Sequence, residues 1–240
     1  ELHRSSTPTA TDSMSTKGGP AAGARVARKT GFDRPLTQEQ YICWGGQLIS
    51  LSLFYALGGV GFDAAPYTPV VIGVHAAIVA LSLGLWLFLE THDPAEPSWW
   101  SRRLPDVDRW TKLSYDRIHM KKIEGLDHFC PWLNVSVGRS NYLPFILLVA
   151  LGLCQFGLQV VVGLLWALSG HYTTIGVAII VLHEVVVVLI WCMYVMLFGF
   201  HLYLASRGLS TTGYLMEMKK PKGAKPKAAR NKAVMRHDGP

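Results

Sequence analysis

The sequence predicts an all-α integral membrane protein with four transmembrane helices and a cytosolic loop between the second and third. Two observations carry this prediction. Half of the 240 residues are hydrophobic and only 16% are charged. The hydrophobic residues also collect into four blocks, each long enough to supply the roughly 20 residues that a helix needs to cross a bilayer. No strand pattern is strong enough to compete with helices in these blocks.

The chain divides by composition into five segments. They are a tail at 1–40, the first two spans at 41–90, a polar loop at 91–142, the third and fourth spans at 143–205, and a basic tail at 206–240. The first tail has few large apolar residues, so it cannot bury enough surface to offset the entropy of ordering, and we expect it to be disordered. Short polar links at 63–68 and 169–174 separate the spans of each pair.

The distribution of Lys and Arg predicts the orientation of the spans. The N-terminal tail holds six of these residues, the loop holds eight and the C-terminal tail holds nine, whereas the two short links hold none. Both termini and the loop are therefore expected in the cytosol. A soluble bundle of unusually apolar helices is the alternative. The protein is expected to be a multi-pass protein of an endomembrane (Golgi or endoplasmic reticulum) or of the plasma membrane.

The loop contains the residues that point to chemistry. It carries the run Asp127-His128-Phe129-Cys130-Pro131-Trp132, and Cys130 is the only cysteine outside the apolar blocks. The four cysteines match neither a disulfide framework nor a paired zinc motif. A cytosolic thiol stays reduced, and a thiol beside an imidazole is a typical pair for covalent catalysis.

The local sequence predicts how these side chains meet. Pro131 disfavours the helical conformation for the residue before it, so Cys130 is expected to be extended. In extended backbone, residues two apart project to the same side, which brings His128 and Cys130 together. Asp127 is then placed to hold the imidazole in the useful tautomer.

The same stretch resembles the signature of the DHHC protein S-acyltransferases (palmitoyltransferases), which reads about D-H-H-C-P-W-x-x-N-C-V-G-x-x-N-Y-x-x-F. The matching residues are Asp127, His128, Cys130, Pro131, Trp132, Val137, Gly138, Asn141, Tyr142 and Phe145. The resemblance covers roughly residues 41–215. It includes Asp93-Pro94 after the second span, and His201 with the Ser210-Thr211-Thr212 cluster after the fourth.

The resemblance implies a two-step acyl transfer. Cys130 would take a fatty acyl group from palmitoyl-CoA and pass it to a cysteine of a cytosol-facing protein. His128 would act as general base, oriented by Asp127, and either Thr211 or Thr212 would support Asp127. The acyl chain would lie in a cavity among the four helices, in contact with membrane lipid.

Other positions take lesser roles in this interpretation. The supporting positions of the motif are Trp132, Asn134 and Asn141. Four basic residues of the loop are candidates for the phosphates of acyl-CoA or for anionic lipid, and these are Arg117, Lys121, Lys122 and Arg139. The basic C-terminal tail lacks aromatic residues, which argues against nucleic-acid binding.

Most departures from the signature concern metal. Phe129 replaces a histidine that is a zinc ligand in the family, and Ser136 stands where the family has the cysteine of Asn-Cys. No cysteine lies between Cys43 and Cys130. Because too few nitrogen and sulfur ligands remain for tetrahedral sites, we expect no structural zinc and no permanently bound cofactor. The loop would then depend on aromatic packing and membrane contact. The acid that follows the Thr pair in the family is also missing, with Tyr214 in its place.

Two other functions remain open from the sequence. The first is a catalytically inactive relative that acts as a membrane scaffold. The second is a small transporter component using His75, His183 and Glu184, because ionisable groups inside a span are costly and often functional. For His183 and Glu184, the functional interpretation is a polar contact with Gln155 or Gln159 that closes the acyl cavity, or a proton path. The less specific interpretation is a hydrogen bond that packs helices together.

Overall fold

The computed structural model describes residues 27–61, 67–168 and 174–219. Most of the two predicted tails and nearly all of the two predicted links lie outside these residues. The described elements, in chain order, are α1 (Gln38–Gly61), α2 (Thr68–Thr91), the short 3-10 helix η1 (Trp100–Arg103), α3 (Asp108–Thr111), β1 (Leu113–Asp116), β2 (Lys121–Glu124), β3 (His128–Cys130), β4 (Val135–Val137), α4 (Tyr142–Leu168), α5 (Thr174–Ser206) and α6 (Thr211–Lys219).

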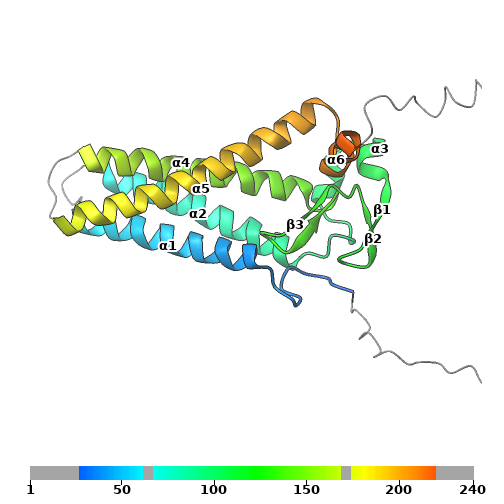
Figure 1. Cartoon of the computed structure of the whole chain (residues 1–240), viewed down its shortest axis with the longest axis horizontal. Coiled ribbons are helices and arrows are strands. Elements are labelled where there is room, and N and C mark those ends of the chain that lie inside the picture. The colour runs from blue at the N-terminus through cyan, green and yellow to red at the C-terminus, as the bar shows by residue number, and fades with distance from the viewer. Residues whose placement is uncertain (1–26, 62–66, 169–173, 220–240) are drawn as a thin grey trace, which may run out of the picture.

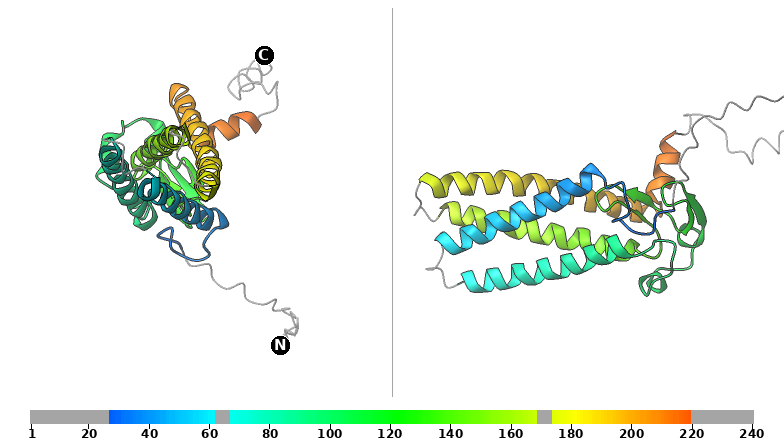
Figure 2. Two further views of the ribbon diagram at one scale, coloured as in Figure 1. Left: turned by 90° about the vertical axis from the view of Figure 1, so that its left-hand side faces the viewer. Right: turned by 90° about the horizontal axis from the view of Figure 1, so that it is seen from below.

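The four long helices lie side by side in one bundle (Figure 1). Helix α4 contacts α1, α2 and α5, so it organises the packing. All four strands lie at one end of the bundle, together with the beginning of the described chain and α6 (Figure 2). The polar loop, the start of the described chain and α6 are therefore on one side of the bundle, and the cytosolic location of that side stays a prediction.

The positions of the helices agree with the predicted spans to within a few residues. By length and composition, three described helices are able to cross a membrane, namely α2, α4 and α5. Helix α1 is 24 residues long but contains a more polar first half, and its role as a fourth span stays a prediction. Many large apolar side chains on the long helices are exposed in the protein itself, as expected for surfaces that face lipid.

The prediction of an all-α protein is wrong in the loop. Two antiparallel strand pairs form there, β1 with β2 and β3 with β4. Each strand has only three or four residues, which is too short for an alternating pattern to be recognised in sequence. The strand pairing satisfies the main-chain N–H and C=O groups of a segment that forms only short helices.

The predicted disordered tail is also too long, because residues 27–37 pack against the folded protein. The Gly31 nitrogen donates to the Glu90 carbonyl oxygen at 2.7 Å, and Asn134 Nδ2 donates to the Gly31 oxygen at 2.8 Å. A Cβ atom at Gly31 would lie 2.4 Å from the Leu133 carbonyl oxygen. The segment is therefore held by main-chain contacts that composition does not reveal.

Polar side chains inside the bundle pair with one another. His75 hydrogen-bonds to Tyr55 through Nδ1 at 3.0 Å and to Gln159 through Nε2 at 2.8 Å. His183 Nδ1 lies 3.0 Å from Glu184 Oε1. The predicted bond between Gln159 and the His183–Glu184 pair is therefore replaced by one with His75. The bonds of His75 join α2 to α1 and to α4, and such bonds stabilise helix association in a membrane.

Candidate active site

The β3–β4 hairpin places the motif. His128 lies opposite Val137 and Cys130 lies opposite Val135, so both functional side chains belong to one extended strand. This is the conformation that Pro131 favours for the residue before it. Because β3 is extended, the imidazole and the thiol project to the same side of the hairpin.

Asp127 is fully buried and accepts several hydrogen bonds. Its Oδ2 atom accepts from Thr211 Oγ1 at 2.6 Å and faces His128 Nδ1 at 2.9 Å. Its Oδ1 atom accepts from the Thr211 nitrogen at 3.1 Å. Burial alone would raise the pKa of Asp127, but the hydrogen bonds from His128 and Thr211 outweigh burial and lower it. The carboxylate is thus held ionised and aimed at the imidazole.

His128 connects Asp127 to Cys130. Its Nδ1 atom faces the carboxylate, which leaves Nε2 for the thiol. Burial lowers the pKa of His128, but hydrogen bonds with Asp127 and Cys130 more than compensate and raise the pKa to about 9. The rings of Phe145 and His201 lie 5.3 Å and 5.6 Å from the imidazole ring. The imidazole therefore holds a proton beside the thiol at neutral pH.

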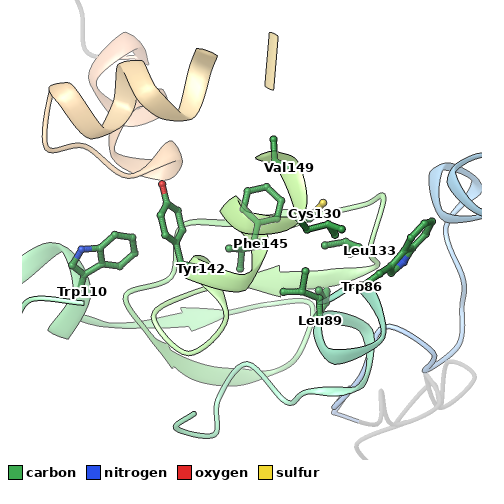
Figure 3. Packing of buried hydrophobic residues seen from close by; sticks show 11 residues of the cluster. Trp86, Leu89, Trp110, Cys130, Leu133, Tyr142, Phe145 and Val149 are labelled. Carbon is green, nitrogen blue, oxygen red and sulfur yellow. The ribbon is translucent and has the colours of Figure 1, made fainter. Parts of the chain in front are cut away.

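Cys130 is a free thiol and is only 6% exposed. It belongs to a buried cluster that also contains Leu89, Leu133 and Phe145. Figure 3 shows the Cys130 side chain between Phe145 and Leu133, where the hairpin meets the bundle. The thiol consequently lies in apolar surroundings at the loop end of the helices.

Comparison with known proteins agrees with this geometry. Residues 107–218 match the family model described as DHHC palmitoyltransferase. Residues 107–218 therefore form a domain of the DHHC palmitoyltransferase type. It is 33% identical over 99 residues to palmitoyltransferase ZDHHC8 of Canis lupus familiaris, covering 39% of this chain and 12% of that protein.

Two further relatives give the same picture. The chain is 35% identical over 95 residues to ZDHHC8 of Homo sapiens, covering 37% of this chain and 12% of the relative. It is 35% identical over 95 residues to ZDHHC5 of Rattus norvegicus, covering 37% and 13%. The chain thus matches only about an eighth of the length of these relatives. Together with the three apolar helices, the DHHC domain indicates a membrane protein.

Arg109 is a residue of the site that the sequence did not reveal. Its guanidinium lies 3.6 Å from Asp127 Oδ1 and is placed over the rings of Trp110 and Tyr142, 4.3 Å and 5.4 Å from their centres. A second positive group thus balances the buried carboxylate of this DHHC protein. The neighbouring Trp110 was the only sequence feature pointing to Arg109, and it was weak evidence, because Arg often stacks on aromatic rings.

The two threonines after the fourth span differ in their contacts. Thr211 donates both its hydroxyl and its main-chain N–H to the Asp127 carboxylate. Thr212 instead donates its main-chain N–H to the Asp127 carbonyl oxygen at 3.1 Å. Its hydroxyl lies 3.1 Å from Ser210 Oγ and 3.5 Å from the Leu126 oxygen. Thr211 is therefore the one that bonds the carboxylate.

The other supporting residues of the DHHC signature act at a distance from the thiol. Asn141 Oδ1 accepts from the Gly138 nitrogen at 2.8 Å, and its Nδ2 donates to the Ser136 oxygen at 3.0 Å. These bonds close the turn from β4 into α4. Asn134 has a φ of 54° and holds the N-terminal segment through Gly31. Trp132 is half-buried against the cluster around Cys130.

The four basic candidates for acyl-CoA separate into two pairs. Arg139 binds Glu124 at 2.9 Å and also Asp106, and Lys121 is paired with Asp93. Arg117 and Lys122 are exposed. Two of the four positive charges are therefore already neutralised within the loop, which leaves the other two more available to an anion.

An apolar pocket lies near the site. Its volume is about 310 Å³. It is lined by Phe32, Trp44, Leu83, Trp86, Leu87 and Glu90. Trp86 belongs to the cluster around Cys130, and Trp44 packs against that cluster. The pocket thus borders the cluster that contains Cys130, whereas the predicted acyl cavity in the middle of the four helices stays a prediction.

The residues at the family's metal positions do not fit zinc. Phe129 and Ser136 face each other across the hairpin, and a phenyl ring and a hydroxyl are not among the nitrogen, sulfur and carboxylate ligands of structural zinc sites. Among the described residues, no group of three or more His, Cys, Asp or Glu is arranged to hold a metal ion.

Proposed function

We propose that this protein is a membrane-bound protein S-acyltransferase. It transfers a fatty acyl group from acyl-CoA to cysteines of cytosol-facing proteins through an acyl-Cys130 intermediate. The observation that carries the proposal is the line of contacts from Thr211 through Asp127 and His128 to Cys130. The family uses acyl-CoA as a substrate, and the buried apolar cluster around Cys130 suits an acyl chain.

The first half-reaction loads the enzyme. The raised pKa of His128 keeps a proton on the imidazole, and a neighbouring cation favours the thiolate form of a cysteine. The Cys130 thiolate attacks the thioester carbonyl carbon of acyl-CoA, and the bond to the CoA sulfur breaks. The imidazolium gives its proton to the departing sulfur, so free CoA leaves as a thiol and His128 becomes neutral.

The second half-reaction restores the starting state. Neutral His128 takes the proton from a substrate cysteine. The new thiolate attacks the acyl-Cys130 thioester, and Cys130 leaves as a thiolate beside the imidazolium. Asp127 stays ionised throughout and stabilises the positive charge on His128 whenever it forms. The sum is one acyl-CoA and one protein thiol converted to CoA and one acylated protein.

The test is incubation of the purified full chain with labelled palmitoyl-CoA, followed by treatment with hydroxylamine, which cleaves thioesters. We expect label that is removed by hydroxylamine and absent in Cys130→Ser. Cys154→Ser and Cys192→Ser are matched controls, because both cysteines are exposed on long helices away from the motif. Label that persists in Cys130→Ser, or never forms in the native chain, would contradict the proposal and favour an inactive scaffold.

A further inference from the structure

The two strand pairs of the loop are separate sheets that side chains connect. No ladder of main-chain bonds joins the β1–β2 sheet to the β3–β4 sheet in the described chain. Instead, Asp116 at the end of β1 accepts a hydrogen bond from Ser136 Oγ of β4 at 2.6 Å. The same oxygen, Oδ2, lies 2.6 Å from His119 Nδ1 in the turn that follows β1.

All three side chains of this cluster are buried. Asp116 is 6% exposed, and His119 and Ser136 are fully buried. The carboxylate also accepts hydrogen bonds from the main-chain N–H groups of Ile118 at 3.0 Å and of His119 at 3.3 Å. Burial raises the pKa of Asp116, but the hydrogen bonds from His119 and Ser136 prevail and lower it to about 2. Pulling the donors away from this buried carboxylate costs free energy, because the negative charge would stay buried without full compensation.

The cluster occupies the place where the family has metal ligands. Ser136 stands at the cysteine of the Asn-Cys pair, and Phe129 stands at the ligand histidine. The two lie opposite each other across the β3–β4 hairpin. The His119 ring lies 6.4 Å from the Phe129 ring. Asp116, His119, Phe129 and Ser136 thus converge on one buried point between the two hairpins.

We propose that Asp116, His119 and Ser136 form a metal-free clamp that takes the place of a zinc ion in joining the β1–β2 hairpin to the strands that carry Cys130. A central anion with fixed donors performs the task that a central cation with fixed ligands performs in a zinc site. Aromatic packing, the expected support of the loop, is also present, between His119 and Phe129 at the cluster and between Trp110 and Tyr142 elsewhere.

The arrangement is not a serine hydrolase triad, although it contains the same three residue types. Ser136 and His119 both bond to the carboxylate of Asp116, so the hydroxyl is not bonded to the imidazole that would have to activate it. A serine with no exposed surface is also closed to a substrate. The cluster therefore holds structure and does no chemistry.

The clamp acts on the candidate active site through the hairpin register. Ser136 lies between Val135 and Val137, the residues that pair with Cys130 and His128. The Val137 carbonyl oxygen also accepts from the Asp127 nitrogen at 2.8 Å. Fixing Ser136 consequently fixes the strand opposite the motif. Asp116, His119 and Ser136 are positioning residues, and the clamp holds whether or not Cys130 is acylated.

The first test measures metal content and thermal melting of the purified full chain with and without EDTA. We expect less than 0.1 zinc per chain, as an order-of-magnitude bound on adventitious metal, and the same melting temperature in EDTA. Asp116→Asn and Ser136→Ala should each lower the melting temperature by several degrees. Ser114→Ala is the control, since it removes a β1 hydroxyl that takes no part in the hydrogen bonds of the cluster. Stoichiometric zinc, or melting that EDTA lowers, would overturn the proposal.

The double variant Asp116→Asn with Ser136→Ala tests the bond itself. We expect it to melt close to Asp116→Asn alone, because the serine has lost its charged partner. If the two single variants lower the melting temperature by amounts that add up in the double variant, the two residues act separately, which contradicts a clamp.

The second test restores a metal site. The triple variant Asp116→Cys, Phe129→His and Ser136→Cys, with His119 retained, supplies two sulfur and two nitrogen ligands. We expect it to bind about one zinc ion per chain and to melt at a temperature that EDTA lowers, opposite to the native chain. A folded triple variant without zinc would show that clamp and metal site do not coincide. If the triple variant does not fold, the EDTA and Asp116→Asn results decide the proposal.

Discussion

Replacing Thr211 by valine tests the support of the candidate active site at its farthest contact from the thiol. The substitution keeps the size of the side chain and removes the hydroxyl that donates to Asp127 Oδ2 at 2.6 Å. The main-chain bond from residue 211 to Oδ1 and the Arg109 contact remain. The carboxylate therefore stays ionised but loses one of the donors that orient it toward His128.

The expected loss follows from the strength of that bond. A hydrogen bond to a charged group contributes about 1.5–3 kcal/mol. A loss of about 1.4 kcal/mol in transition-state stabilisation is tenfold in rate. Thr211→Val should therefore slow acylation of Cys130 by roughly ten- to a hundredfold. We expect a slowing near the lower end of this range, because the other donors to Asp127 remain.

The assay is single-turnover formation of labelled acyl-enzyme, with Thr212→Val as the matched variant. The Thr212 hydroxyl has no contact with the carboxylate, and its nearest partners are Ser210 Oγ and the Leu126 oxygen. We expect Thr212→Val to slow acylation much less than Thr211→Val. Equal losses in the two variants, or a larger loss for Thr212→Val, would refute the assignment of Thr211 as the residue that orients Asp127.

Two further predictions concern stability. The pKa of His128 is raised from its ordinary value of 6.5 to about 9. Its contribution to the free energy of unfolding is therefore fully present below pH 6.5 and is lost as the pH rises through 9. The melting temperature should fall more between pH 6.5 and 9 in the native chain than in His128→Gln, and equal falls would contradict the raised pKa. Gly31→Ala should destabilise by about 1–3 kcal/mol through overpacking, because its Cβ would meet a carbonyl oxygen at 2.4 Å. Gly84→Ala, where the Cβ meets nothing within 4 Å, is the control in a denaturation series, and equal costs would contradict the docking of the N-terminal segment.

The helices were predictable because hydropathy is a local property. A block of apolar residues long enough to cross a bilayer is visible in any window of the chain, and α2, α4 and α5 coincide with three such blocks. The extended conformation at Cys130 was predictable for the same reason, since Pro131 restricts only its immediate neighbour. Both predictions needed no knowledge of distant residues.

The strands and the ordered N-terminal segment were not predictable in this way. β3 and β4 have three residues each, and their pairing depends on a turn at Asn134 that adopts a positive φ. The segment around Gly31 is ordered by Glu90 and Leu133. Such contacts join residues far apart in the chain, so composition alone indicated disorder.

The sequence by itself predicted Cys130 as the nucleophile, His128 as its imidazole partner and the apolar helices beside them, because each prediction depends on residue type and short-range geometry. The tertiary structure decided which threonine bonds to Asp127, that Arg109 balances its charge, and that Asp116 joins the two hairpins. The physical reason is distance along the chain. Thr211 and Asp127 are 84 residues apart, and only the packing of α6 against the loop end of the bundle brings a hydroxyl to that buried carboxylate.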